Sequence, residues 1–226
     1  IYFILFLVTI LFFFKKTFGK SDKVEYSKDN ISNYFSGIVS LNRDYASTTF
    51  KYLNKVRTLK SSHSNFNVQF IRTLILLEKF EQAFTFSKSI WLEDKLFFEV
   101  DLLLGLNSFI EKDFLNAEKY FKRLNKISRY NLLFEDFLAN ILLSWAKASE
   151  GNKNDSFKFL DKIPERYHNL KQIQNSLLQC YFDTPRTQVA FEQLIHRKDS
   201  IFSRYNFFLT NYLLFKNKNL EAEKVI

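Results

Sequence analysis

Histidines, the single cysteine and the acidic residues are the side chains of this sequence that could do catalytic or metal chemistry. His63, His168 and His196 each stand alone, with no second histidine three or four positions away. A zinc site needs several nitrogen or sulfur ligands, and covalent catalysis needs a nucleophile beside a base. Cys180 has no second cysteine to pair with. We therefore expect no catalytic residue, no metal, no cofactor and no small-molecule substrate.

Glycine and proline are scarce, which limits both the chemistry and the fold. Four dispersed glycines cannot form a phosphate-binding loop. Together with two prolines, they are also too few for the many tight turns of a sandwich or barrel. Apolar residues make up 46% of the 226 residues, which is enough for a buried core. The expected fold class is all-α.

The elements that would position any site are helices, because apolar residues recur three or four positions apart between short polar turns. Similar turns stand at 42–48, 76–83, 110–117, 150–156, 183–186 and 217–222. The first four are successively 35, 34 and 39 residues apart. Short connections make consecutive helices antiparallel, and such hairpins bury too little surface unless they stack. We expect an α-solenoid of stacked antiparallel helical hairpins, with a globular helical bundle as the alternative.

The third copy resembles a tetratricopeptide repeat. Leu104-Gly105 stands at the small-residue position of its first helix, Ala117 at that of its second helix, and Phe121 at the aromatic position. We expect Gly105 and Ala117 to face each other where the two helices approach. The other copies depart from the pattern with larger or polar residues, at Ile71, Thr48 and Ser156. The resemblance covers residues 30–226.

This resemblance implies a partner groove lined by the first helix of each hairpin. The family's groove positions fall here on Asn33, Gly37, Ser40, Val68, Arg72, Ile75, Leu102, Leu106, Phe109, Ile141, Trp145 and Ala148. We predict that a protein or peptide partner binds Asn33, Val68, Arg72, Ile75, Leu102, Leu106, Phe109, Ile141 and Trp145. Trp145 is either a central anchor for that partner or a residue that packs between helices.

The family's clamp for a C-terminal carboxylate needs lysines, asparagines and an arginine at set groove positions. Those positions are occupied by Asn33, Gly37, Gln69, Glu99 and Leu103. The acidic Glu99 would repel a carboxylate, so the resemblance does not extend to chaperone-tail binding.

Nucleic-acid binding is the alternative function, because pentatricopeptide proteins read RNA with helical repeats of similar length. The net charge of +9 suggests an acidic partner. However, residues 1–60 carry +6 and the remaining 166 residues carry only +3. We therefore expect no nucleic-acid partner for the repeats.

The N-terminal segment reads as a membrane signal or anchor. Ile1–Phe14 is uncharged, and Lys15 and Lys16 follow directly. Fourteen helical residues span about 21 Å, less than the roughly 30 Å of a bilayer core. An uncleaved anchor, a signal peptide and a buried helix all remain open. The chain lacks methionine and stops at Ile226 within a helix-like stretch, so we interpret it as a fragment.

We expect three regions: an apolar signal or anchor at 1–18, a polar linker at 19–29, and a repeat domain at 30–226. The sequence resembles bacterial envelope-associated tetratricopeptide proteins, which implies a membrane-anchored or periplasmic protein with its repeats on a side that the sequence leaves open. The predicted function is a non-catalytic protein-interaction scaffold.

Overall fold

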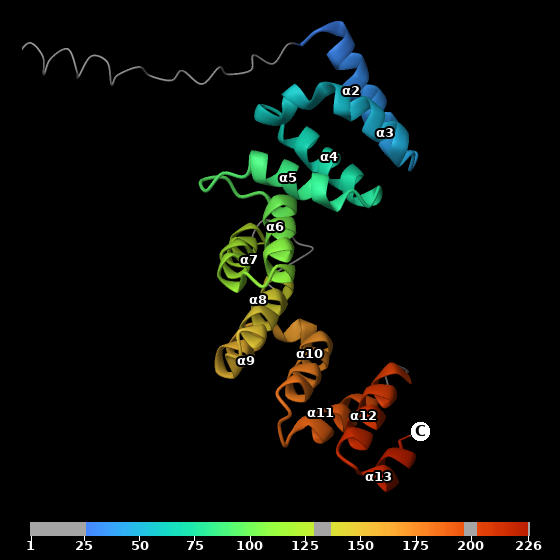
Figure 1. The fold of residues 1–226 in the computed structure, drawn as a ribbon, viewed down its shortest axis with the longest axis vertical. Helices are drawn as coiled ribbons and strands as arrows, with labels where there is room; N and C mark the ends of the chain where they lie inside the picture. Colours follow the sequence, from blue (N-terminus) through green and yellow to red (C-terminus); the bar gives the residue numbers. More distant parts are fainter. Residues whose placement is uncertain (1–25, 129–136, 197–202, 226) are drawn as a thin grey trace, which may run out of the picture. The chain divides into compact units, whose positions relative to one another are not determined.

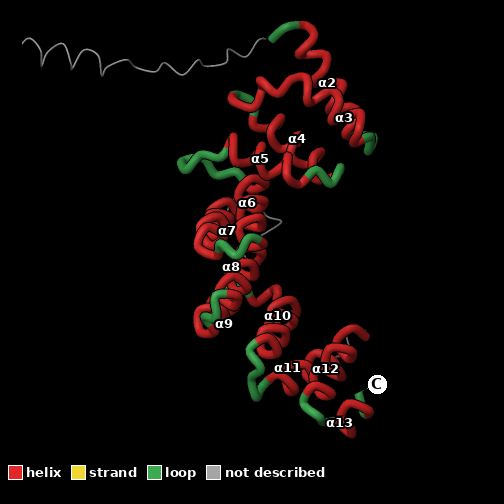
Figure 2. The backbone as a smooth tube through the Cα atoms, in the orientation of Figure 1, coloured by secondary structure: helices red, strands yellow, loops and turns green. Residues whose placement is uncertain are grey.

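The computed structural model describes residues 26–128, 137–196 and 203–225, and within these ranges the chain forms helices and connecting turns without a strand. The chain divides into two compact units, which we describe separately: unit 1 ends at Phe80 and unit 2 begins at Glu81. Figures 1 and 2 display the helices in chain order. The apolar segment at 1–18 and residues 19–25 of the expected linker lie outside the described residues.

The helices have the following bounds. Unit 1 contains α2 (Lys28–Leu41), α3 (Ala46–Leu53), the 3-10 helix η1 (Asn54–Ser61) and α4 (Ser64–Leu76). Helix α5 (Phe80–Ile90) begins at the boundary, and unit 2 continues with α6 (Phe98–Ile110), α7 (Phe114–Ser128), α8 (Phe137–Ser149), α9 (Lys153–Asp161), the 3-10 helix η2 (Glu165–Tyr167), α10 (His168–Tyr181), α11 (Thr187–Ile195), α12 (Ser203–Phe215) and α13 (Asn219–Glu223).

Six turns repeat the same backbone geometry. Each contains one residue with positive φ, namely Asp44, Glu78, Lys112, Gly151, Asp183 and Asn217. In every case the next residue donates its N–H to the carbonyl five positions earlier, at 2.8–3.0 Å. This is the Schellman arrangement that ends a helix. The positive-φ residues are 34, 34, 39, 32 and 34 apart, so the backbone carries the repeat that the sequence predicts.

These turns correct the sequence register in the first hairpin. Asp44 and Glu78 are 34 residues apart, whereas the sequence comparison aligned Tyr45 with Phe80 at a spacing of 35. The small buried position of α3 is therefore Thr49, which is fully buried, and not Thr48, which is exposed. The prediction was wrong by one residue because it followed the aromatic side chain and not the backbone turn.

Small residues allow the two helices of a hairpin to approach, but the partner of Gly105 differs from the prediction. A methyl group added at Gly105 would lie 2.5 Å from Cε1 of Phe121 and 3.2 Å from Cβ of Tyr120. Ala117 is fully buried one helical turn from Phe121. The nearest atoms to Gly105 thus belong to Phe121 and Tyr120, because the small residue accommodates a large ring and not a second small residue.

Unit 1 is built on a core shared by its four helices. Leu53, Phe66, Phe70 and Leu74 are fully buried. The Phe66 and Phe70 rings stack with centroids 5.5 Å apart. A methyl group at Gly37 of α2 would lie 2.5 Å from Cδ2 of Leu53, so the glycine permits the close approach of α2 and α3.

Unit 2 has a series of apolar clusters that follow one another along the chain. The first joins α7 and α8, the second joins α8, the α9 region and α10, and the third joins α11, α12 and α13. Each helix packs mainly on its neighbours in sequence. This sequential packing of antiparallel hairpins is the organisation of an α-solenoid.

Helix α2 begins inside the expected linker at 19–29. Ser27 caps it by accepting a hydrogen bond from the N–H of Asn30 at 3.2 Å, and Asp29 lies in its first turn. No helix in the described ranges has both the length and the apolar character needed to cross a membrane.

Candidate functional site

The predicted groove residues of unit 1 lie on α2 and α4. Asn33 is half-buried and donates its side-chain amide to the carbonyl of Asp29 at 2.8 Å. Val68 is half-buried, and Arg72 and Ile75 are exposed. The spacing of the last three residues places them on one face of α4. Of the clamp positions, Gly37 and Leu103 are buried.

Three predicted groove residues of unit 2 lie along α6. Leu102, Leu106 and Phe109 are half-buried and pack against the cluster of α7 and α8. The Phe109 ring also meets Phe114 edge-on, with centroids 5.7 Å apart. Their spacing of four and three residues gives α6 one partly exposed apolar row.

Ile141 and Trp145 lie on α8, and both are half-buried against the cluster that includes α10. The Trp145 indole N–H donates to Oε1 of Gln174 at 2.8 Å. Its ring meets Tyr181 edge-on, with centroids 5.8 Å apart. Trp145 thus packs between two first helices, α8 and α10, and keeps part of its surface accessible.

A buried ion pair that the sequence prediction missed organises the loop between α5 and α6. Asp101 is fully buried on α6 and accepts a hydrogen bond from Nε of Arg123 on α7 at 2.7 Å. Asp101 also accepts from the indole of Trp91 at 3.0 Å. The Arg123 guanidinium donates to the carbonyls of Leu92, Glu93 and Lys95.

This network has a structural role, because its polar groups are satisfied by one another. The Arg123 guanidinium also stacks over Trp91, 5.0 Å from the ring centroid. The sequence did contain a signal: two acids, Glu99 and Asp101, interrupt the apolar stretch 96–106, and an acid that becomes buried there needs a cationic partner.

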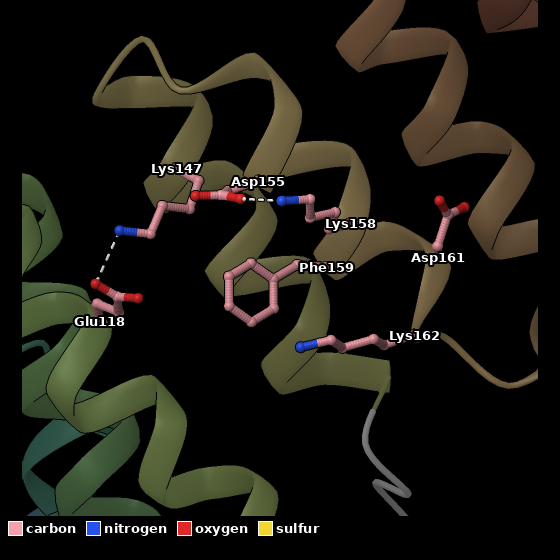
Figure 3. Close-up of a pocket in the computed structure, with 7 residues that line it drawn as sticks. All are labelled: Glu118, Lys147, Asp155, Lys158, Phe159, Asp161 and Lys162. Atoms are coloured by element: carbon pink, nitrogen blue, oxygen red, sulfur yellow. Dashed lines mark hydrogen bonds and ion pairs between the residues drawn. The ribbon is translucent and has the colours of Figure 1, made fainter.

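A cleft of about 500 Å³ lies among α7, α8 and α9. Figure 3 shows its seven lining residues, which are Glu118, Lys147, Asp155, Lys158, Phe159, Asp161 and Lys162. Lys147 bridges Glu118 and Glu150, both at 2.8 Å. Lys158 pairs with Asp155 at 3.0 Å. The cleft therefore offers both signs of charge. Lys147 and Lys158 are already paired within the protein, and Lys162 lies over the Phe159 ring, 4.5 Å from its centroid.

The electrostatics of this cleft fix its two central groups in their charged forms. Burial alone would raise the pKa of Glu118, but hydrogen bonds from Lys147 and Lys122 bring that pKa below its usual value. Burial opposes the charged form of Lys147 as well, yet hydrogen bonds to Glu118 and Glu150 raise its pKa. Both groups are therefore charged near neutral pH.

A second cleft of about 280 Å³ occupies the equivalent place in the last described repeat, among α11, α12 and α13. Counted from the positive-φ residue, Asp155 matches Glu221, and Phe159 matches Val225. Both clefts lie beside second helices, whereas the predicted groove residues lie on first helices. Sequence reasoning did not single out the second-helix side.

The residues with catalytic potential are dispersed in the structure. His63 precedes α4 and contacts the Tyr34 ring, and His196 is exposed after α11. Burial and the nearby Asp183 raise the pKa of the Cys180 thiol, which keeps it protonated. The described residues contain no group of three or more histidine, cysteine or acidic side chains placed to hold a metal ion.

Comparison with known proteins bears on the fold. No protein-family model matches the chain, and no curated protein matches its sequence. A crystal structure of a tetratricopeptide repeat protein from Parabacteroides merdae is similar over 88% of this chain and 78% of its own, with a TM-score of 0.70 and 10% identity. The apo form of RapI is similar over 91% of this chain and 83% of its own, with a TM-score of 0.50 and 15% identity. This protein therefore has the fold of a tetratricopeptide-like helical repeat protein.

Proposed function

We propose that this protein is a non-catalytic scaffold that binds a peptide or protein partner along its first helices. The observation that carries the proposal is the partly exposed apolar row of Leu102, Leu106 and Phe109 on α6. This row lies on the first helix of a hairpin whose turn occurs six times in the described part of the chain. Apolar side chains at helical spacing are suited to anchoring a helical or extended peptide.

The packing of Trp145 refines this proposal. Its indole N–H is satisfied by Gln174, and its ring rests on Tyr181, so α8 and α10 hold it in a fixed orientation. A rigid, half-buried aromatic residue makes an effective anchor, since little side-chain entropy is lost on binding. We propose that Trp145 contributes its exposed edge to the partner surface.

The test is a peptide selection followed by affinity measurements. Peptides selected from a displayed random library on the parent protein are titrated against Leu106→Glu. The matched control is Leu115→Glu, which places the same charge on an exposed residue at the start of the second helix α7. We expect Leu106→Glu to weaken binding about tenfold or more, and Leu115→Glu to leave it unchanged.

If circular dichroism shows that both variants are folded and both bind the peptides with equal affinity, the partner does not bind along the first helices. If no peptide is selected and RNA oligonucleotides bind with strong salt dependence, the pentatricopeptide-like alternative takes its place.

For the location, we propose attachment to a bacterial membrane through the segment before residue 19. The support is the apolar run Ile1–Phe14 and the lysines that follow it. A topology reporter fused after Asn30 would identify the side that carries the helices. Recovery of the whole protein in the soluble fraction would contradict membrane attachment.

A further inference from the structure

Unit 1 carries a cationic surface that the proposed partner groove does not use. From Tyr45 to Leu77 the sequence contains no aspartate or glutamate, although it contains five lysines and arginines. Four of these lie close together in sequence on α3 and η1: Lys51, Lys55, Arg57 and Lys60. We call these four residues the basic surface.

The fold turns the basic surface towards solvent. Helix α3 continues into η1 with a kink at Val56, whose φ is −113°. Val56 and Leu59 are buried against the rest of unit 1, and this fixes the orientation of η1. All four basic side chains are exposed. The buried residues that hold η1 in place therefore leave its positive charges on the surface.

The three lysines of the basic surface have no acidic partner among the described residues of unit 1. Within residues 26–80, Lys51, Lys55 and Lys60 form no ion pair with a described carboxylate. The closest aromatic contacts are made by Lys55, 5.7 Å from the Tyr52 ring centroid, and by Arg57, 5.3 Å from that of Phe70. In the cleft of α7, α8 and α9, by contrast, Lys147 and Lys158 are each paired with a carboxylate.

We propose that the basic surface contacts an anionic phospholipid bilayer. Juxtamembrane clusters of lysine and arginine are attracted by acidic lipid headgroups within about a Debye length. The inference rests on the membrane location proposed above, because thirteen residues between Phe14 and Lys28 reach at most about 45 Å. An N-terminal segment held in a bilayer would therefore keep unit 1 near the headgroups.

The aromatic residues of this region favour lipid over single-stranded RNA. RNA readers present exposed aromatic rings on which bases stack. Here the Phe70 ring is fully buried and stacks on Phe66 and Phe50. The Phe70 ring beside Arg57 is therefore not available to stack on a base, and the Tyr52 ring beside Lys55 is half-buried.

The experiment is vesicle flotation of the 226-residue chain on neutral phosphatidylcholine vesicles and on vesicles with about one third phosphatidylglycerol. Neutral vesicles report binding by the apolar N-terminal segment, and the difference between the two compositions reports charge. The test variant is Lys51→Gln/Lys55→Gln/Lys60→Gln. The matched control, Lys88→Gln/Lys126→Gln/Lys153→Gln, removes the same charge from exposed positions of unit 2.

We expect the parent and the control to prefer anionic vesicles and to lose that preference between about 0.05 M and 0.5 M salt. The test variant should bind anionic vesicles about 100-fold more weakly while binding neutral vesicles as the parent does. The inference is overturned if the control loses as much affinity as the test variant, or if the test variant keeps the preference. It is also overturned if single-stranded RNA displaces the parent from anionic vesicles when RNA phosphate and lipid phosphate are at equal concentration. The selected peptides of the preceding test should bind the test variant normally, so failure of either proposal can be recognised separately.

Discussion

Replacing Asp101 with asparagine is the sharpest test of how this fold is held together. The substitution preserves the shape of the side chain and can retain the hydrogen bond from the Trp91 indole. It removes the negative charge that faces Arg123, whose side chain is only 9% exposed. The guanidinium would then be a buried cation without an anion.

The expected cost follows from the partners that remain. Removing one member of a buried ion pair costs about 3–5 kcal/mol. In Asp101→Asn the guanidinium keeps its three backbone carbonyl acceptors, so we expect the lower end, about 3 kcal/mol. Against a total stability of about 5–15 kcal/mol, this is a large share. Arg123→Met leaves the buried carboxylate unpaired and should cost at least as much.

Urea denaturation followed by far-UV circular dichroism measures these losses. Glu93→Gln is the matched control, because Glu93 lies in the same loop with its side chain 81% exposed and only a 4.0 Å pairing with Lys119. This control should stay within about 0.5 kcal/mol of the parent. The double variant Asp101→Asn/Arg123→Met should lose about 1–3 kcal/mol less than the sum of the single losses.

A loss below about 1 kcal/mol for Asp101→Asn would refute the assignment of a buried charge pair. Additive single losses would refute the coupling between Asp101 and Arg123. Either result would mean that the attraction between the two charges is not what holds the loop between α5 and α6.

Two further predictions concern close packing and pH. Gly105→Ala should lower the free energy of unfolding by about 1–3 kcal/mol, because its methyl group would overlap Phe121. Gly151→Ala has no atom within 4 Å of its methyl group and should cost only about 1 kcal/mol, because of its positive φ of 80°. Equal losses of the two variants in urea denaturation would contradict this distinction. Because the pKa of Glu118 is lowered in the folded protein, its contribution is present above its unfolded pKa near 4.5 and is lost as pH falls through the folded pKa. The urea midpoint of the parent should therefore fall more between about pH 6 and pH 3 than that of Glu118→Gln, and parallel curves would be the contrary result.

The helical fold could be predicted because the spacing of apolar residues and the polar turns both follow the repeat. The third hairpin was the clearest, although Gly105 contacts Phe121 and not, as its pattern predicted, Ala117. The first hairpin was displaced by one residue, because the sequence comparison aligned the aromatic residues Tyr45 and Phe80 and not the turn residues Asp44 and Glu78. Only Gly151 among the six positive-φ residues is a glycine, so residue type marks these turns poorly.

The candidate site could be predicted only in outline, since its details depend on contacts distant in sequence. Helical spacing placed Leu102 and Leu106 on one face of α6, and the structure finds them half-buried there. The hydrogen bond from Trp145 to Gln174 joins residues 29 apart, and the Arg123 bond to Glu93 joins residues 30 apart. No local pattern contains such pairs, so the role of Trp145 between α8 and α10 could not be decided from the sequence.

The small-residue position of the first helices explains how the repeat can persist with so little sequence pattern. Seven residues before each positive-φ residue stand Gly37, Ile71, Gly105, Ser144, Ser176 and Thr210, and all six are buried. In the fourth hairpin the Ser144 hydroxyl donates to the carbonyl of Ser156 on the facing helix at 2.8 Å, and in the fifth the Ser176 hydroxyl donates to that of Ala190 at 3.0 Å. A serine is thus accepted where a glycine stands elsewhere, because its volume is small and its buried hydroxyl is satisfied across the hairpin. Ile71 fills the same position with a larger side chain, and the buried Thr210 hydroxyl has no hydrogen-bond partner within the described residues, so the position tolerates several residue types. This tolerance is consistent with a TM-score of 0.70 to a tetratricopeptide repeat protein at 10% identity.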